Sequence, residues 1–328
     1  MSFLACRVYE MDGRVETRIE TMEIDGLSPG EVVIRASHSG INYKDALAVT
    51  GRGKILKRFP LNAGIDVVGV VESSGDSRYK PGDAVLVNGM GIGENHDGGF
   101  AQYVRVPADW IVPLPAGLTP VEAMTLGTAG FTAALAVHRM EINGQVPDMG
   151  PIAVTGATGG VGSIAISILA SRGYEVHAIS GRPDFREYLR NLGAHQVLTP
   201  EQLELGKRPL ESVKYGGVVD NVGGALLAGL VRHVQLWGNI GSIGMAGGHE
   251  LDTSVFPFIL RGVSILGISS ANCPMPLRTE VWNRLGDTLK PRQLASVVNK
   301  TVRLSDIPAC AEDVLDRKSY GRILVDCA

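Results

Sequence analysis

The first third of the chain alternates short apolar runs with turn residues. Apolar positions either alternate with polar ones or gather in short runs over residues 28–37, 64–76, 80–89 and 98–106. Pro-Gly and Gly-Asp pairs separate these runs, as they do between strands. The pattern up to about Pro120 therefore predicts a β-rich domain with a barrel-like core and little helix.

The pattern changes at Thr119. A Thr followed three residues later by Glu122 is a helix start signal, and the apolar residues of 119–140 then continue around a helix. Strand-like and helix-like runs alternate after this connecting segment, which predicts a parallel sheet with helices on both faces. The expected strands are 151–156, 174–181, 218–224, 238–244 and 263–269, and the expected helices are 163–173, 184–194 and 225–234.

The C-terminal part adds a helix at 278–289 and a last strand at 322–328, which we assign to the first domain. The expected fold class is α/β, with a doubly wound parallel sheet of the Rossmann type beside a β-rich domain. The expected domains are 1–126 with 271–328, and 127–270.

One segment, 149–171, has no charged side chain over 23 residues, which is nominally long enough to span a bilayer. Five glycines lie within it, between a β-branched run and a run of small residues. A strand, a turn and a helix explain this composition better than a membrane span does, and we expect no membrane partner.

Composition narrows the function classes. The chain has 328 residues, 45% of them hydrophobic and 20% charged, and a formal charge of −3 without a block of like charges. Nothing here indicates nucleic acid binding. The four cysteines form no Cys-x-x-Cys pair, and the N-terminus lacks the apolar run of an export signal, so we expect a cytoplasmic protein.

The most informative motif is TGATGGVGS, residues 155–163. It follows an expected strand and opens an expected helix, which is the context that a dinucleotide-binding turn requires. Gly159 lets the backbone approach a pyrophosphate, Gly160 relaxes the turn and Gly162 lets the helix pack close to the strand. A tight strand-to-helix connection is the simpler alternative.

The end of the next strand indicates which dinucleotide binds. NAD-binding proteins place an acidic residue there to bind the ribose hydroxyls. This chain has Ser180, Gly181 and Arg182 instead, so a hydroxyl and a guanidinium are available for a 2′-phosphate. The sequence therefore favours NADPH, although a solvated arginine in a turn would look the same.

Taken together, GINYKDAL (40–47), PLNAGIDVVGVV (60–71), GMGIGENHDGGFAQYV (89–104), TGATGGVG and AISGR resemble the acrylyl-CoA reductase group. This group belongs to the zinc-free, quinone-oxidoreductase-like branch of the medium-chain dehydrogenase/reductase superfamily. The resemblance covers nearly the whole chain and implies a GroES-like first domain.

Zinc-dependent members of that superfamily use cysteine, histidine and glutamate around their catalytic metal. The matching positions here are Asn42, Ile65 and Asp66, and no cysteine lies between Cys6 and Cys273. We therefore expect no metal site.

The resemblance implies NADPH-dependent reduction of the C=C bond of a small enoyl-CoA, such as acryloyl-CoA to propanoyl-CoA. Hydride addition to the β-carbon of an enoyl thioester produces an enolate, which hydrogen-bond donors can stabilise without a metal. Two alternatives remain open: an NADPH-dependent quinone reductase, and a binding or structural protein that keeps NADPH as a stabilising ligand.

The resemblance also implies site residues. Asn42 and Tyr43 are the catalytic candidates, Asn42 as an amide donor and Tyr43 beside the nicotinamide, although a helix cap and a packed aromatic ring are the simpler interpretations. The expected cofactor-binding residues are Tyr43, Thr158, Gly159, Gly160, Val161, Ser180, Gly181, Arg182, Met245, Ile259, Ser270, Gly321 and Arg322.

A CoA substrate calls for cations near its phosphates. The expected substrate-binding residues are Arg52 and Lys54 in a basic run, Arg278, and Trp282, whose ring could stack on adenine; a solvated basic loop is the alternative. His96 is either a proton donor or, more simply, a residue that shapes its loop. The uncharged run SILGISS (264–270) at a sheet edge predicts a homodimer.

Overall fold

The computed structural model describes all residues, 1–328. Contacts divide the chain into two compact units. The first comprises Met1–Thr128, Ala271–Gly286 and Val298–Ala328, and the second comprises Ala129–Ser270 and Asp287–Val297. The segment Asp287–Val297 thus belongs with the second unit, whereas the sequence pattern assigned it to the first.

The first unit is built mainly from strands. Its strands are β1 (Ser2–Met11), β2 (Arg14–Glu23), β3 (Val32–Ile41), β4 (Leu61–Asn62), β5 (Asp66–Ser74), β6 (Ala84–Asn88), β7 (Tyr103–Val106), β8 (Val112–Pro113), β15 (Val298–Arg303) and β16 (Arg322–Asp326). Its helices are α1 (Tyr43–Thr50), α7 (Met275–Leu285) and α8 (Ile307–Leu315), with short 3₁₀ turns at η1 (Ile24–Gly26), η2 (Ala108–Trp110) and η7 (Leu304–Asp306).

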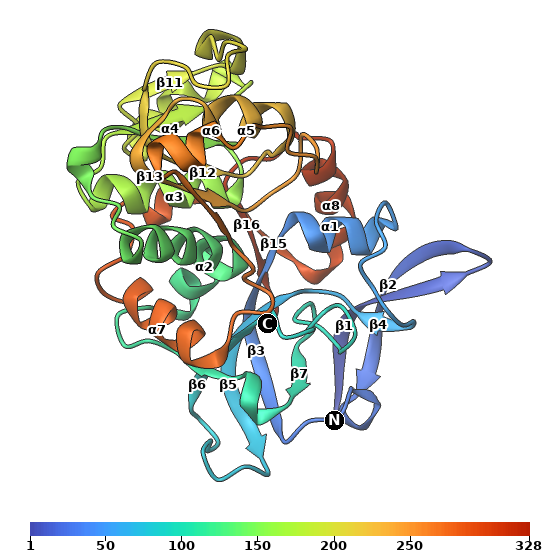
Figure 1. Cartoon of the computed structure of the whole chain (residues 1–328). Helices are drawn as coiled ribbons and strands as arrows, with labels where there is room; N and C mark the ends of the chain where they lie inside the picture. The colour runs from blue at the N-terminus through green and yellow to red at the C-terminus, as the bar shows by residue number, and fades with distance from the viewer. The chain divides into compact units, whose positions relative to one another are not determined.

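These strands form two sheets. One has the order β2-β1-β4, and the other has the order β15-β16-β3-β5-β6-β8, with β7 also paired to β3. The last strand of the chain, β16, runs antiparallel to β3 and pairs Ile323 with Ile41 (Figure 1). Valine and isoleucine side chains from β3, β5, β6 and β16 fill the core. The β-rich first domain is confirmed, and the last strand, β16, lies in its larger sheet.

The second unit contains a parallel sheet of six strands. Its strands are β9 (Ile152–Thr155), β10 (Val176–Ile179), β11 (Gln196–Leu198), β12 (Tyr215–Asp220), β13 (Val234–Ser242) and β14 (Ser264–Gly267). Its helices are α3 (Gly160–Ser171), α4 (Arg186–Asn191), α5 (Gly224–Val231) and α6 (Phe256–Arg261), with short turns η3 (Pro147–Met149), η4 (Pro183–Phe185), η5 (Pro200–Leu203) and η6 (Leu294–Val297).

The strand order is β11-β10-β9-β12-β13-β14, and every pair is parallel. This is the 3-2-1-4-5-6 order of a Rossmann fold, in which ligands bind at the carboxyl ends of the strands. The α/β prediction is confirmed. The uncharged segment 149–171 begins at the last residue of η3 and contains β9, the glycine-rich turn and α3, which are the predicted strand, turn and helix.

The helix α2 (Pro120–Ile142) has a kink at Gly127, whose φ of 49° and ψ of −153° lie outside the helical region. It is the one helix long and apolar enough to cross a membrane by length and composition. However, 78% of its most apolar window is buried inside the protein, as in a core helix.

Candidate functional site

Two fully buried side chains, Asp66 at the start of β5 and Arg322 at the start of β16, lie opposite each other. The Arg322 Nη2 atom is 3.6 Å from Asp66 Oδ2. Asp66 also accepts hydrogen bonds from the Thr128 amide at 2.9 Å and from the Thr128 hydroxyl at 2.6 Å. A buried carboxylate is tolerated only when it is paired and hydrogen-bonded, as this one is.

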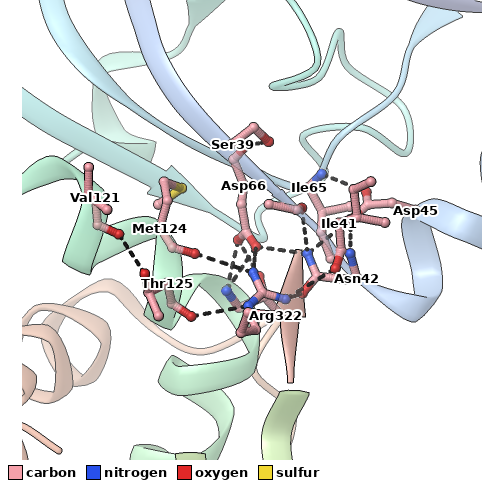
Figure 2. Close-up of polar contacts among 12 residues, drawn as sticks. Ser39, Ile41, Asn42, Asp45, Ile65, Asp66, Val121, Met124, Thr125 and Arg322 are labelled. Carbon is pink, nitrogen blue, oxygen red and sulfur yellow. Dashed lines mark hydrogen bonds and ion pairs between the residues drawn. The ribbon is translucent and has the colours of Figure 1, made fainter. Parts of the chain in front are cut away.

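The guanidinium of Arg322 is fully occupied within this unit, as Figure 2 shows. Its Nε donates to the carbonyl of Thr125 at 3.1 Å, and its Nη1 donates to the carbonyl of Ile41 at 3.2 Å and to Asn42 Oδ1 at 2.8 Å. Its Nη2 donates to the carbonyl of Met124 and faces Asp66. No N–H of Arg322 is left for a cofactor phosphate, so the predicted role of Arg322 in cofactor binding is wrong.

Asn42 lies at the N-cap position of α1, and its side-chain amide is used completely by its neighbours. The Nδ2 atom donates to Asp45 Oδ2 at 2.9 Å and to Asp66 Oδ2 at 2.8 Å, while Oδ1 accepts from Arg322 (Figure 2). The backbone N–H of Asn42 also donates to Asp45 in a capping box. The amide therefore has no donor to offer a substrate, which corrects the prediction that it acts as one.

Asp45 is the second buried carboxylate of this network. It accepts from Asn42 and, at 2.9 Å, from the amide of Ile65. Burial, followed by the nearby charge of Asp66, raises the pKa of Asp45 to about 7. Burial also lowers the pKa of Arg322, against the opposing effect of Asp66 and Asp45. One guanidinium thus faces two carboxylates, and a proton on Asp45 would make the group neutral.

Two glycines leave room for this network. A Cβ atom at Gly127 would lie 2.7 Å from both Arg322 Nη2 and Asp66 Oδ2, and Gly127 also has a positive φ. A Cβ atom at Gly40 would likewise meet the Arg322 guanidinium. Gly321, another expected cofactor residue, has a φ of 54° and turns the chain into β16.

Tyr43 follows the network at the first position of α1, and its side chain faces outward. The residue is 58% exposed, and no protein group bonds to its phenol. The structure thus excludes the packed aromatic that a simple interpretation suggested. The phenol of Tyr43 therefore stands at the N-terminus of α1, which the Asn42 cap fixes.

The residues at this point do not fit a zinc ion. Asn42 is engaged as described, Ile65 is apolar, and Asp66 is paired with Arg322. No group of three or more His, Cys, Asp or Glu side chains anywhere in the chain could hold a metal ion.

Arg278 and Trp282 do not form a surface for CoA, and this prediction is wrong. Both are 0% exposed. Arg278 Nη1 donates to the carbonyl of Asn88 at 2.6 Å and to Asn88 Oδ1 at 3.0 Å, and the Trp282 indole donates to the same Oδ1 at 3.0 Å. Together they join α7 to the end of β6.

The basic run of the first unit is on the surface, as expected. Arg52 is paired with Glu312 at 3.2 Å and with Asp316 at 3.1 Å, both on α8. Lys54 is exposed and has no partner in the protein. His96 is buried, and its Nε2 lies 2.9 Å from the carbonyl of Pro29, so it shapes its loop.

In the second unit, the glycine-rich turn joins β9 to α3. Gly159 is the N-cap residue of α3, Gly160 and Val161 form its first turn, and Thr158 lies just before it. A Cβ atom at Gly162 would collide with the backbone of Gly156, so only glycine fits there. The first turn of an α-helix next to such glycines presents free N–H groups to an anion.

The end of β10 carries Ser180, Gly181 and Arg182 at the same edge of the sheet. The Ser180 hydroxyl accepts from the Arg182 amide at 3.1 Å. The Arg182 guanidinium lies 4.0 Å from the centre of the Phe185 ring, and partial burial lowers its pKa. Stacking on Phe185 orients the guanidinium at the strand end, where the sequence predicted a phosphate contact.

The three remaining cofactor candidates, Met245, Ser270 and Ile259, lie in different parts of the second unit. Met245 follows β13 and Ser270 follows β14, so both lie beyond the carboxyl ends of the strands. Ile259 lies on α6, whose last residue, Arg261, donates to the carbonyls of Arg232 and Val234 at the amino end of β13. Ile259 itself is exposed, and its role in cofactor binding stays a prediction.

Sequence reasoning did not include Asp45 among the site residues. The spacing of Asn42 and Asp45 is that of a capping box, which could have indicated the first contact of the network. No local signal joins these residues to Arg322, because 280 positions separate it from Asn42.

Family models match both parts of the chain. Residues 28–116 match the alcohol dehydrogenase GroES-like domain, and residues 160–287 match the model described as zinc-binding dehydrogenase.

Two curated relatives align over nearly their full length. The acrylyl-CoA reductase AcuI of Ruegeria pomeroyi is 43% identical over 97% of this chain and 96% of its own. YhfP of Bacillus subtilis, provisionally named a quinone oxidoreductase, is 45% identical over 95% of this chain and 94% of its own. A crystal structure of YhfP with NAD bound superposes with a TM-score of 0.98 at 43% identity and 99% coverage of both chains.

The yhdH oxidoreductase of Salmonella enterica, solved in complex with NADP, superposes with a TM-score of 0.95 at 41% identity over 99% of each chain. Sequence and fold therefore agree along the whole length of the chain. The protein belongs to the medium-chain dehydrogenase/reductase superfamily, in the quinone-oxidoreductase-like group that includes the acrylyl-CoA reductases.

Proposed function

We propose that this enzyme, an NADPH-dependent oxidoreductase, reduces the C=C bond of a small enoyl-CoA and converts acryloyl-CoA to propanoyl-CoA. The observation that carries this proposal is the buried network of Asn42, Asp66 and Arg322, in which Asn42 and Asp66 stand at positions that the family resemblance matches to the zinc site of zinc-dependent members. These residues do not form a set of ligands for a metal ion that could polarise a substrate. Because the donors of Asn42 and Arg322 are already used within the network, an enolate would be stabilised by donors next to it, such as the exposed phenol of Tyr43.

The residues of the second unit fit NADPH. The start of α3 presents backbone N–H groups for the pyrophosphate, with Thr158, Gly159, Gly160 and Val161 beside it. No carboxylate stands at the end of β10, where Ser180, Gly181 and Arg182 would hold the 2′-phosphate. Met245 and Ser270 are further proposed contacts.

When bound, the reduced nicotinamide supplies the hydride. The chain's own residues position and polarise the reactants. Tyr43 offers an exposed phenol that has no partner in the protein, and the capping box fixes the helix start on which it stands. We assign to Tyr43 the orientation of the nicotinamide or of the substrate, and to Asn42 the positioning of Tyr43.

Lys54 is the proposed contact for the phosphates of CoA, because its ammonium is exposed and unpaired. Arg52 contributes less than the sequence suggested, since Glu312 and Asp316 already compete for its guanidinium. We further propose a homodimer in the cytoplasm, joined through the edge strand β14, with no metal, nucleic acid or membrane partner.

A second candidate, quinone reduction, is favoured by the provisional name of the Bacillus subtilis relative. One experiment separates the two. NADPH oxidation is followed with acryloyl-CoA, crotonoyl-CoA and a benzoquinone at matched concentrations. A kcat/KM for acryloyl-CoA well above that for the quinone is expected, whereas turnover of the quinone alone would overturn the enoyl-CoA assignment.

A further inference from the structure

A pocket lies within the first unit, apart from the buried network. Its volume is about 420 Å³. It is lined by the start of α1, the basic run, the loop after β6 and the segment before α7, through Lys44, Lys57, Met90, Gly91, Glu94, Asn95, Ala271, Asn272, Cys273, Pro274 and Met275.

Hydrogen bonds among the lining segments fix the walls of this pocket. The Lys57 amide donates to the carbonyl of Glu94 at 2.8 Å, and the Met90 amide donates to the carbonyl of Ala271 at 3.1 Å. Behind this wall, the buried Arg278 donates to the carbonyl of Ala271 at 3.2 Å. Arg278 therefore supports the pocket from inside the protein and does not contact its contents.

The polar groups of the pocket favour a negative or strongly accepting oxygen. Lys44 and Lys57 are the cationic residues of the lining, and Glu94 is its one carboxylate residue. Lys44 Nζ lies 2.9 Å from Glu94 Oε1, which holds the ammonium in place with the Lys44 side chain still 36% exposed. A pre-positioned ammonium of this kind can donate to an oxygen on which charge develops.

The other walls are apolar or weakly polar, with Met90, Pro274 and Met275 among them. A ligand that fits both parts has a short hydrocarbon chain next to a carbonyl oxygen. The acyl head of an enoyl thioester has this chemistry, whereas the diphosphate end of CoA has no apolar part to place against the methionines.

We propose that this pocket binds the acyl thioester head of the substrate and that Lys44 donates to its carbonyl oxygen; this inference rests on the proposed function. In the reaction, a hydride with its two electrons forms a C–H bond at the β-carbon. The C=C electron pair moves to the α-carbon–carbonyl bond, and negative charge reaches the thioester oxygen beside Lys44. A proton from solvent then adds to the α-carbon and restores the carbonyl, leaving the nicotinamide oxidised.

The test pairs a residue change with the removal of one atom from the ligand. Propanoyl-CoA and S-propyl-CoA, a thioether without the carbonyl oxygen, are titrated calorimetrically into the protein saturated with NADP⁺. Wild type is expected to bind the thioester about tenfold or more tightly than the thioether, since a hydrogen bond to a charged group has that magnitude. In Lys44→Met the two affinities become equal, and in Lys44→Arg part of the difference returns.

Turnover gives an independent readout. Lys44→Met is expected to lower kcat with acryloyl-CoA by about 10²–10³-fold, the usual effect of removing one oxyanion donor. Lys80→Met, at an exposed turn outside the pocket, serves as the control and keeps wild-type kcat. Thermal unfolding of each variant shows whether it is folded.

The outcomes distinguish the two proposals. If wild type reduces only the quinone, the proposed function fails and the pocket assignment fails with it. If wild type reduces acryloyl-CoA and Lys44→Met, folded, keeps both its kcat and its preference for the thioester, the function stands and the pocket assignment is overturned.

Discussion

The guanidinium of Arg322 donates to the side-chain oxygen of Asn42 at 2.8 Å, so a residue near the end of the chain fixes the amide that caps α1. The same guanidinium is the counter-charge of the buried Asp66 carboxylate. Stability and site geometry are thus connected through one side chain.

Replacement of Arg322 by Met should lower the free energy of unfolding by about 3–5 kcal/mol, because Asp66 would remain buried without its counter-charge. Denaturant unfolding measures the change. The double variant Arg322→Met with Asp66→Asn is expected to recover part of the loss; a double variant that is less stable by the sum of the two single changes would argue against the pairing.

Stability should fall as pH rises toward neutrality because of Asp45. Its pKa is raised from 3.8 in the unfolded reference to about 7 in the folded state. The folded protein therefore holds a proton that the unfolded chain releases between these values, and this contribution is lost as pH approaches 7. Asp66, Arg322 and Cys6 are the ionisable groups around it.

In Asp45→Asn this pH dependence should flatten between about pH 4 and pH 7. Urea unfolding across the range measures it, with the exposed Asp252→Asn as control. A curve for Asp45→Asn parallel to that of wild type would contradict the assignment of the proton to Asp45.

Replacement of Gly127 by Ala should destabilise the protein more than replacement of Gly144 by Ala. Both glycines have positive φ, at 49° and 84° respectively. A Cβ atom at Gly144 meets nothing within 4 Å, whereas one at Gly127 lies 2.7 Å from Arg322 and Asp66. The Gly144 change costs about 1 kcal/mol for backbone strain alone. Equal melting temperatures of the two variants would show that the network can shift to accept a methyl group.

Arg182→Ala should raise the KM for NADPH much more than the KM for NADH, because the guanidinium is proposed to bind the 2′-phosphate that NADH lacks. Steady-state kinetics with both cofactors measure the ratio. Arg186→Ala, at an exposed position of α4, is the matched control. Equal losses with both cofactors would remove the phosphate contact from Arg182.

The edge strand β14 should join two copies of the chain. Its residues carry no charge, and large apolar side chains nearby, including Leu236, Trp237 and Leu260, are exposed. Light scattering at micromolar concentration is expected to give the mass of a dimer. A monomer at that concentration would rule out this interface.

The sequence predicts much of the fold, because apolar periodicity and turn residues within short segments determine most of the strands and helices. The alternating runs predicted five of the six strands of the parallel sheet, all except β11, and the glycine-rich turn lies where the pattern put it. Among the elements that were not predicted are β11, α6, α8 and β15. Each is short, and the apolar positions of β15 are only partly buried, so its sequence lacks a clear period of two.

Side-chain roles were harder to predict than strands. Arg278 and Arg322 resemble ligand-binding arginines in sequence, since an arginine is usually exposed. Only the packed structure shows that carbonyl oxygens from distant segments surround both. The position of Tyr43 follows from the sequence, because Tyr43 comes directly after the capping residue, and its role stays a prediction.

Most of the second unit, Ala129–Ser270, is inserted between Thr128 and Ala271 of the first, and β16, the partner of β3, follows that insertion in the chain. During synthesis, the ribosome must therefore complete the Rossmann unit before the strand that covers one side of β3 exists. Domains fold in the order in which they emerge, and an unpaired strand edge invites association. The larger sheet of the first unit therefore stays incomplete until β16 has been synthesised. Arg322, at the start of β16, then supplies the counter-charge of Asp66.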